Sequence, residues 1–166
     1  MRALLLGMLL LAGCATLPAP SRPPVDAIAV FAFSGRLAVR QGETRHHLKI
    51  DWRHDAAQDE ILLATPLGQG VAEIVRDAAG ARLRLADTRA FAATDWSSLA
   101  EQVFGFRLPL AAAPRWLLGA EGDMEGWSLR VLERENDSAN ALPALIELER
   151  DDIQVRLKID EWSEVR

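Results

Sequence analysis

Cys14 is the one cysteine of the chain, and its neighbours indicate chemistry at its thiol. It directly follows Leu-Ala-Gly at residues 11–13, which end an apolar run behind the positively charged Arg2. A positive start, a short apolar run and small residues before a cut site are typical of a secretory signal. We expect residues 1–13 to be a cleaved lipoprotein signal peptide and the Cys14 thiol to form a thioether with diacylglycerol. The alternative is an ordinary secreted protein with a cysteine near its cleavage point.

The three histidines are the next candidates, because imidazole binds metals and transfers protons. They are His46, His47 and His54, all in or beside one expected strand. Since His46 and His47 are adjacent, they point to opposite faces of a strand, which is poor geometry for a metal site. We interpret all three as solvated histidines on a polar face and expect no metal.

Motifs of other enzyme classes are incomplete. Residues 126–130 (Gly-Trp-Ser-Leu-Arg) begin like the turn that presents a catalytic serine, but they lack its final glycine. Adjacent acids such as Asp59 and Glu60 fall on opposite faces of a strand. The sequence has no glycine-rich phosphate loop that leads into a helix. We therefore expect neither catalysis nor a cofactor, and a periplasmic hydrolase or lipid-modifying enzyme stays only as a third hypothesis.

Charge and composition limit the other classes of function. The formal net charge of −5 argues against nucleic acid as a partner. Four prolines between residues 18 and 24 favour an extended tether. We expect residues 14–26 to be the lipidated cysteine with its tether, and residues 27–166 to be a single, monomeric domain.

Apolar and polar residues alternate with a two-residue period over most of that domain. In residues 31–40 the apolar side chains take the odd positions, and similar alternation recurs in residues 47–53, 82–85 and 153–160. Turn residues such as Gly, Asp and Asn separate these runs. Short strands at this spacing favour an antiparallel meander that curls into a barrel or a sandwich, with one face in water.

The middle of the chain departs from this two-residue alternation. Residues from Trp96 to Val103 follow the spacing of one helix face, Thr94 or Asp95 can cap the helix, and Gly105 can end it. A second short helix is expected over residues 111–118, up to Gly119. Its start is later than residue 111 if Pro114 is to lie in its first turn. The sequence predicts a sheet interrupted by a helical insertion with an apolar face.

Residues 66–70 (Pro-Leu-Gly-Gln-Gly) resemble the tip of a hairpin, because proline and glycine form tight turns. Leu67 is then either exposed at the tip or folded back over the end of the core, and the residues leave both open. An exposed Leu67 predicts an apolar finger that touches a bilayer or a lipid in transit.

Five tryptophans and five phenylalanines occur in a chain without tyrosine. They indicate either a well-filled core or a cavity for an apolar ligand.

In order along the chain, these motifs resemble the LolB family of outer-membrane lipoprotein receptors. They are Ser34-Gly35-Arg36-Leu37-Ala38-Val39, Trp52, Thr65-Pro66-Leu67-Gly68-Gln69-Gly70, Leu108-Pro109-Leu110, Trp116-Leu117-Leu118-Gly119, Gly126-Trp127, Leu142-Pro143, Arg156-Leu157-Lys158-Ile159 and Trp162. The chain departs from the family pattern at Val131-Leu132-Glu133, where tyrosine is frequent, and its late hairpin looks shortened.

The resemblance implies an α+β, mainly antiparallel β fold: a half-open, unclosed β-barrel covered by short helices, with an apolar cavity. It implies that the protein accepts acylated lipoproteins from LolA, a soluble periplasmic carrier, and inserts them into the inner leaflet of the outer membrane. Its own lipid anchor would hold it in outer-membrane phospholipid, and Ala15 after the lipidated cysteine agrees with outer-membrane sorting. Pro66, Leu67 and Gly68 would form the membrane-insertion loop.

The apolar side chains are the candidates for the acyl-chain cavity and its lid. They are Phe33, Leu37, Ile50, Trp52, Leu63, Leu83, Leu85, Trp96, Leu99, Val103, Trp116, Trp127, Leu129, Ile146, Leu148 and Leu157.

Energetics agree with such a carrier role. Exposure of acyl chains to water costs about 0.8 kcal/mol per CH₂, so three chains of about 15 methylenes cost roughly 30 kcal/mol. Without a nucleotide-binding motif, transfer must run downhill from carrier to receptor to bilayer. The alternative hypothesis is a non-catalytic lipoprotein that scaffolds an outer-membrane assembly complex.

Overall fold

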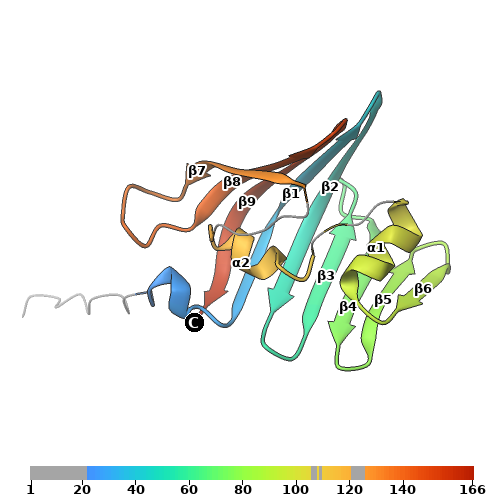
Figure 1. Ribbon diagram of the computed structural model, residues 1–166, viewed down its shortest axis with the longest axis horizontal. Helices are drawn as coiled ribbons and strands as arrows, with labels where there is room; N and C mark the ends of the chain where they lie inside the picture. Colours follow the sequence, from blue (N-terminus) through green and yellow to red (C-terminus); the bar gives the residue numbers. More distant parts are fainter. Residues whose placement is uncertain (1–21, 106–107, 109, 121–125) are drawn as a thin grey trace, which may run out of the picture.

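The computed structural model describes residues 22–105, 108, 110–120 and 126–166 (Figure 1). The expected signal peptide, Cys14 and residues 15–21 of the expected tether lie outside these ranges. Within them, no helix has the length and apolar character needed to span a membrane.

In the described part of the chain, nine strands form one sheet in the order β6-β5-β4-β3-β2-β1-β9-β8-β7, and all neighbours are antiparallel. This confirms the predicted meander. The edge strands β6 and β7 do not pair with each other, so the sheet is unclosed over the described residues. The strands are β1 (Phe31–Gln41), β2 (Thr44–His54), β3 (Asp59–Ala64), β4 (Gly70–Asp77), β5 (Gly80–Leu85), β6 (Ala90–Ala93), β7 (Ser128–Arg134), β8 (Pro143–Arg150) and β9 (Ile153–Val165).

The connection between the two edge strands explains why helices cover the sheet. Because β6 and β7 lie at opposite edges, the chain between them must cross the sheet. It carries α1 (Trp96–Phe104) and α2 (Ala113–Leu117), which lie over the same face of the sheet (Figure 1). We call this the helix-covered face and the opposite one the outer face.

The ends of α1 follow the predicted capping residues. The Asp95 carboxylate accepts hydrogen bonds from the backbone N–H and the hydroxyl of Ser98, both at 2.9 Å. These bonds lower the pKa of Asp95, the backbone bond most of all. Gly105 ends the helix with a φ of 77°, a left-handed conformation that suits glycine. Asp95, one of the two predicted caps, and Gly105 are thus confirmed.

The second helix is shorter than residues 111–118 but begins where the sequence predicts. α2 starts at Ala113, so Pro114 lies in its first turn, where a missing N–H leaves no acceptor unsatisfied. Gly119 follows it with a φ of 87°.

The folded unit begins earlier than the tether prediction implies. A 3₁₀ turn covers Val25–Ala27, and Val25 packs against the core. The Arg22 guanidinium forms an ion pair with the Glu135 carboxylate, between the ends of β7 and β8. Arg22 and Val25, in the expected tether, therefore contact the domain.

The strand register sorts the side chains onto faces as the alternation predicts. Phe33 lies level with Trp52 on β2 and Trp162 on β9, and Trp52 lies level with Ile61 on β3. These apolar side chains belong to one core cluster beneath the helices. The intervening charged residues, such as Lys49 on β2, therefore take the outer face.

Gly35 occupies a position where no side chain fits. A register shift between Ser34 and Gly35 marks an irregularity in the pairing of β1 with β9. A Cβ atom at Gly35 would lie 2.4 Å from the carbonyl oxygen of Lys158, so the two backbones approach too closely for any other residue.

Candidate functional site

Aromatic side chains fill one end of the helix-covered face. The rings of Phe31 and Phe33 pack against Trp162, with centroids 5.7 and 5.2 Å away. Trp52 lies 6.1 Å from Phe33 and 6.4 Å from Trp96. All but Trp162 are buried, so we call these five residues the aromatic end.

Aliphatic side chains line the other end, toward the β1–β2, β3–β4 and β8–β9 turns. They pack against the core but stay partly exposed, and we call them the aliphatic end: Leu37, Leu63, Leu129, Leu148 and Val155. The register joins three of them across the sheet, because Val155 pairs with Leu148 and Leu148 pairs with Leu129. Apolar surface of this kind gains about 25 cal/mol for each Å² that a ligand covers.

The sixteen predicted cavity and lid residues differ in how far they are buried. On the strands they share the helix-covered face, and those from the helical insertion are packed in the core clusters. Ten are buried, namely Phe33, Ile50, Trp52, Leu83, Trp96, Leu99, Trp116, Trp127, Ile146 and Leu157, and six are partly exposed, namely Leu37, Leu63, Leu85, Val103, Leu129 and Leu148. The surroundings of Trp96, Trp116 and Trp127 are packed, because these side chains are only 3–5% exposed.

The loop between β3 and β4 is a tight, internally bonded turn. The Gly68 N–H donates to the Thr65 carbonyl at 2.8 Å, and the Thr65 N–H donates to the Gln69 carbonyl at 2.8 Å. Gly68 has a φ of 88°, which glycine adopts without strain. Leu67, at the tip, is 91% exposed. Of the two alternatives left by the sequence, the structure therefore shows the exposed one.

A buried carboxylate near the aromatic end was missed by the sequence interpretation. Asp59 is 1% exposed and accepts hydrogen bonds from the Trp52 indole at 2.9 Å and from the His54 ring at 2.7 Å. Arg76 forms an ion pair with the same carboxylate. His54 is thus partly buried and paired, contrary to its interpretation as a solvated histidine. Pairing of residues on three strands created this cluster, so no local sequence signal marked it.

The charges and hydrogen bonds around Asp59 indicate a structural role for this cluster. Burial alone would raise the pKa of Asp59, but the hydrogen bonds from His54, Trp52 and Arg76 outweigh it and lower the pKa. Because Trp52, His54 and Arg76 all direct hydrogen bonds to it, the Asp59 carboxylate is stabilised in its ionised form and joins three strands. His46 and His47 are exposed, and the described part of the chain holds no cluster of three metal-ligating side chains.

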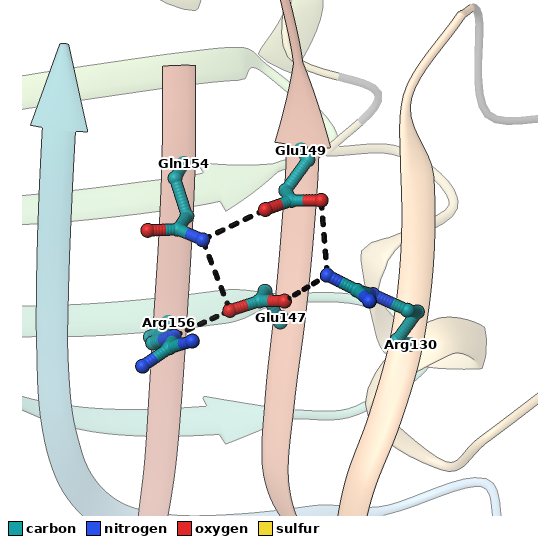
Figure 2. Close-up of polar contacts among 5 residues, drawn as sticks. All are labelled: Arg130, Glu147, Glu149, Gln154 and Arg156. Atoms are coloured by element: carbon teal, nitrogen blue, oxygen red, sulfur yellow. Dashed lines mark hydrogen bonds and ion pairs between the residues drawn. The ribbon is translucent and has the colours of Figure 1, made fainter. Parts of the chain in front are cut away.

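A second buried carboxylate lies on the outer face (Figure 2). Glu147 is 2% exposed because Arg130 and Arg156 cover it from β7 and β9, each in an ion pair with it. The hydrogen bond from Arg156 lowers the pKa of Glu147 against the effect of burial, and the charge of Arg130 adds to this. Gln154 joins Glu147 to Glu149 with hydrogen bonds of 3.1 and 2.7 Å.

Comparison with known proteins agrees with this geometry. Residues 29–126 match the family described as LolB, outer membrane lipoprotein LolB. The chain belongs to the LolB family. It is 34% identical over 184 residues to the outer-membrane lipoprotein LolB of Dechloromonas aromatica, with 98% of this chain and 96% of the relative covered. It is 36% identical over 180 residues to that of Chromobacterium violaceum, with 98% of both chains covered.

Membership in the LolB family confirms the predicted class and location, a lipoprotein of the outer membrane that serves protein transport. The family match extends from the start of the sheet through β1–β6 and both helices. It therefore includes the Leu67 loop, the crossing connection and most of the aromatic end. The relatives also align with β7–β9, since they cover nearly the whole chain.

Proposed function

We propose that this LolB family member takes the acyl chains of lipoproteins from a LolA-like periplasmic carrier onto its helix-covered face. It then inserts them into the inner leaflet of the outer membrane. The observation that carries the proposal is the arrangement of two apolar features at one end of the sheet. The partly exposed aliphatic end and the 91% exposed Leu67 both lie toward the β3–β4 turn.

Acyl chains would first cover the aliphatic end. Its side chains already expose apolar surface, so contact with a chain releases water without breaking the core. Deeper entry requires movement of the crossing connection, because Trp96 and Trp116 are packed against the sheet. The backbone of α1 rests mainly on β5 and β6, while its Trp96 packs against Trp52 on β2, so a shift of α1 must release this aromatic contact.

Delivery would use the Leu67 loop. Its backbone hydrogen bonds hold the turn, so the leucine is presented without ordering a flexible segment on contact. Burial of one leucine side chain in a bilayer gains about 2 kcal/mol. This is enough to favour contact with the bilayer and too little to hold the protein there, which suits a step that must be reversible.

The decisive experiment separates acceptance from insertion. In Leu67→Glu, the loop carries a charge that resists entry into hydrocarbon, so uptake of lipoprotein from the carrier should persist while transfer into liposomes is lost. The matched control is Leu62→Glu, because Leu62 is a 52% exposed leucine on the neighbouring strand β3. The control should keep both steps. Failure of the wild-type protein to accept lipoprotein from the carrier would overturn the proposal.

A further inference from the structure

A hollow on the outer face runs beside the Leu67 loop. It has a volume of about 570 Å³ and is lined by the cations Arg36, Lys49, Arg156 and Lys158, with Pro66 of the loop in its wall. Lys49 pairs with the last residue of β3, Ala64, so its backbone lies at the foot of the loop. The apolar tip and the cationic hollow are therefore parts of one surface.

A second hollow continues the first along the same strands. It has a volume of about 340 Å³ and adds Arg40 and Arg45. The two share Ala38, His47 and Arg156 in their linings, and we call them together the cationic groove. The groove follows β1, β2 and β9 toward their shared turn end.

Half of the cations in the cationic groove are not neutralised. Three have acidic partners, because Arg36 pairs with Asp160, Arg156 with Glu147 and Lys158 with Glu133. The other three, Arg40, Arg45 and Lys49, are exposed and have no ion pair among the residues that the structure describes.

Glu133 lines the larger hollow beside Lys158, and further acidic side chains lie at either end of the groove. Asp51, Glu60 and Glu73 line a separate hollow farther along the outer face, away from the Leu67 loop. Glu43 and Asp152 lie in the turns beyond the strand ends. Of the unpaired cations, Lys49 thus lines the hollow that Pro66 of the loop also lines, and Arg40 and Arg45 line its continuation toward the β1–β2 turn.

We propose that the cationic groove binds the phosphates of anionic phospholipid headgroups in the bilayer, and so turns the Leu67 loop toward the membrane. This inference deepens the proposed function and rests on it. A bilayer surface offers apolar chains and negative headgroups side by side, which matches a leucine beside unpaired cations. Because the whole chain carries a charge of −5, an anionic surface repels it on average. The unpaired cations of the cationic groove therefore determine which side of the protein faces the bilayer.

The test uses the mature lipidated protein in proteoliposomes, with a fluorophore attached to Gln69→Cys at the loop. Quenching of the fluorophore by brominated lipid reports contact of the loop with the bilayer. One vesicle set contains phosphatidylethanolamine with phosphatidylglycerol, and the other contains phosphatidylethanolamine with phosphatidylcholine. The variant replaces the unpaired cations (Arg40→Gln, Arg45→Gln and Lys49→Gln). The control makes the same charge change elsewhere (Arg53→Gln, Arg84→Gln and Arg89→Gln).

We expect stronger quenching in the phosphatidylglycerol vesicles, with a loop-contact equilibrium that falls on the order of 100-fold in the groove variant at low salt. The control variant should lose little, and high salt should reduce the difference between the vesicle sets. Equal quenching of the wild-type protein in both sets would overturn the inference, as would an equal loss in the control variant.

A second arm measures uptake of lipoprotein from the carrier in detergent-free solution without acceptor vesicles. The groove variant should take up lipoprotein like the wild-type protein. Slower uptake in this variant would overturn the inference, because the groove would then serve the carrier. If the wild-type protein shows no uptake at all, the proposed function fails, and the quenching result still decides the headgroup assignment separately.

Discussion

The aromatic end and the aliphatic end share one face of one sheet, yet they differ in how completely their side chains are packed. At the aromatic end, Phe31, Phe33, Trp52 and Trp96 are at most 5% exposed, and a buried ion cluster around Asp59 adjoins them. At the aliphatic end, every member keeps part of its surface in water. The protein thus separates the packing that holds the fold from the apolar surface left available to a ligand.

This difference has a physical origin in the arrangement of the chain. The aromatic end receives Ile28 and α2 in addition to the strands, all members of one core cluster. Trp127 packs at the opposite end, where Arg150 lies over its ring beside the β8–β9 turn. The aliphatic end lies toward the turns of the long strands β1, β2 and β9. Large-to-small changes cost most where packing is complete. Substitutions at the aromatic end should therefore mainly lower stability, and those at the aliphatic end should mainly weaken ligand binding.

The largest expected effect is on folding at the aromatic end. Phe33→Ala should lower the free energy of unfolding by about 3–5 kcal/mol, because it leaves a cavity among three packed rings. Urea unfolding followed by tryptophan fluorescence measures this. A loss below about 1 kcal/mol would show that this end relaxes as easily as a partly exposed surface, and the contrast between the ends would be wrong.

A smaller effect concerns the pH dependence of stability. The pKa of Asp59 is lowered in the folded protein, so its contribution is fully present above the unfolded pKa of about 3.9 and is lost as pH falls through the folded value. Asp59→Asn should destabilise by about 3 kcal/mol at neutral pH, because Arg76 and His54 lose their buried partner. Unfolding measured from pH 7 to pH 3 should show the variant and the wild-type protein converging in acid. A constant difference across this range would contradict the assignment.

The smallest effect on stability is expected at the aliphatic end. Leu129→Ala should cost about 1 kcal/mol, because the side chain is only partly buried. It should nevertheless weaken acyl-chain binding, measured by displacement of a fluorescent fatty acid. Leu62→Ala, an exposed leucine outside this face, serves as the control and should leave binding unchanged. Equal binding in both variants would remove the aliphatic end from the proposed site.

Local patterns in the sequence were enough to predict strands, faces and caps. Alternation identifies the two faces of β1 because successive side chains in a strand must point in opposite directions. The burial of Asp59 could not be predicted in this way, because it depends on the register that brings His54, Asp59 and Arg76 level on three strands. The requirement for glycine at Gly35 likewise depends on β9, which lies more than a hundred residues farther along the chain.

The residues of the candidate site could be predicted from the sequence, but the burial of each side chain could not. Periodicity placed Leu37 and Phe33 on one face, but only the assembled sheet shows that the first is partly exposed and the second is buried. The same holds for Leu67, whose position in a turn followed from proline and glycine. Its exposure depends on the absence of any neighbour near the tip, which no local pattern records.

If the sheet binds acyl chains as proposed, its two unpaired edges bear on how much of them it can shelter. A fully closed barrel has its diameter set by strand number and stagger. Over the described residues β6 and β7 remain apart, so no ring of backbone hydrogen bonds dictates the curvature here. Small rotations shared among successive strands can then change the separation between the sheet and the helices that cover it. Capacity would follow the size of the passenger, and one scaffold could serve lipoproteins whose fatty chains differ in length.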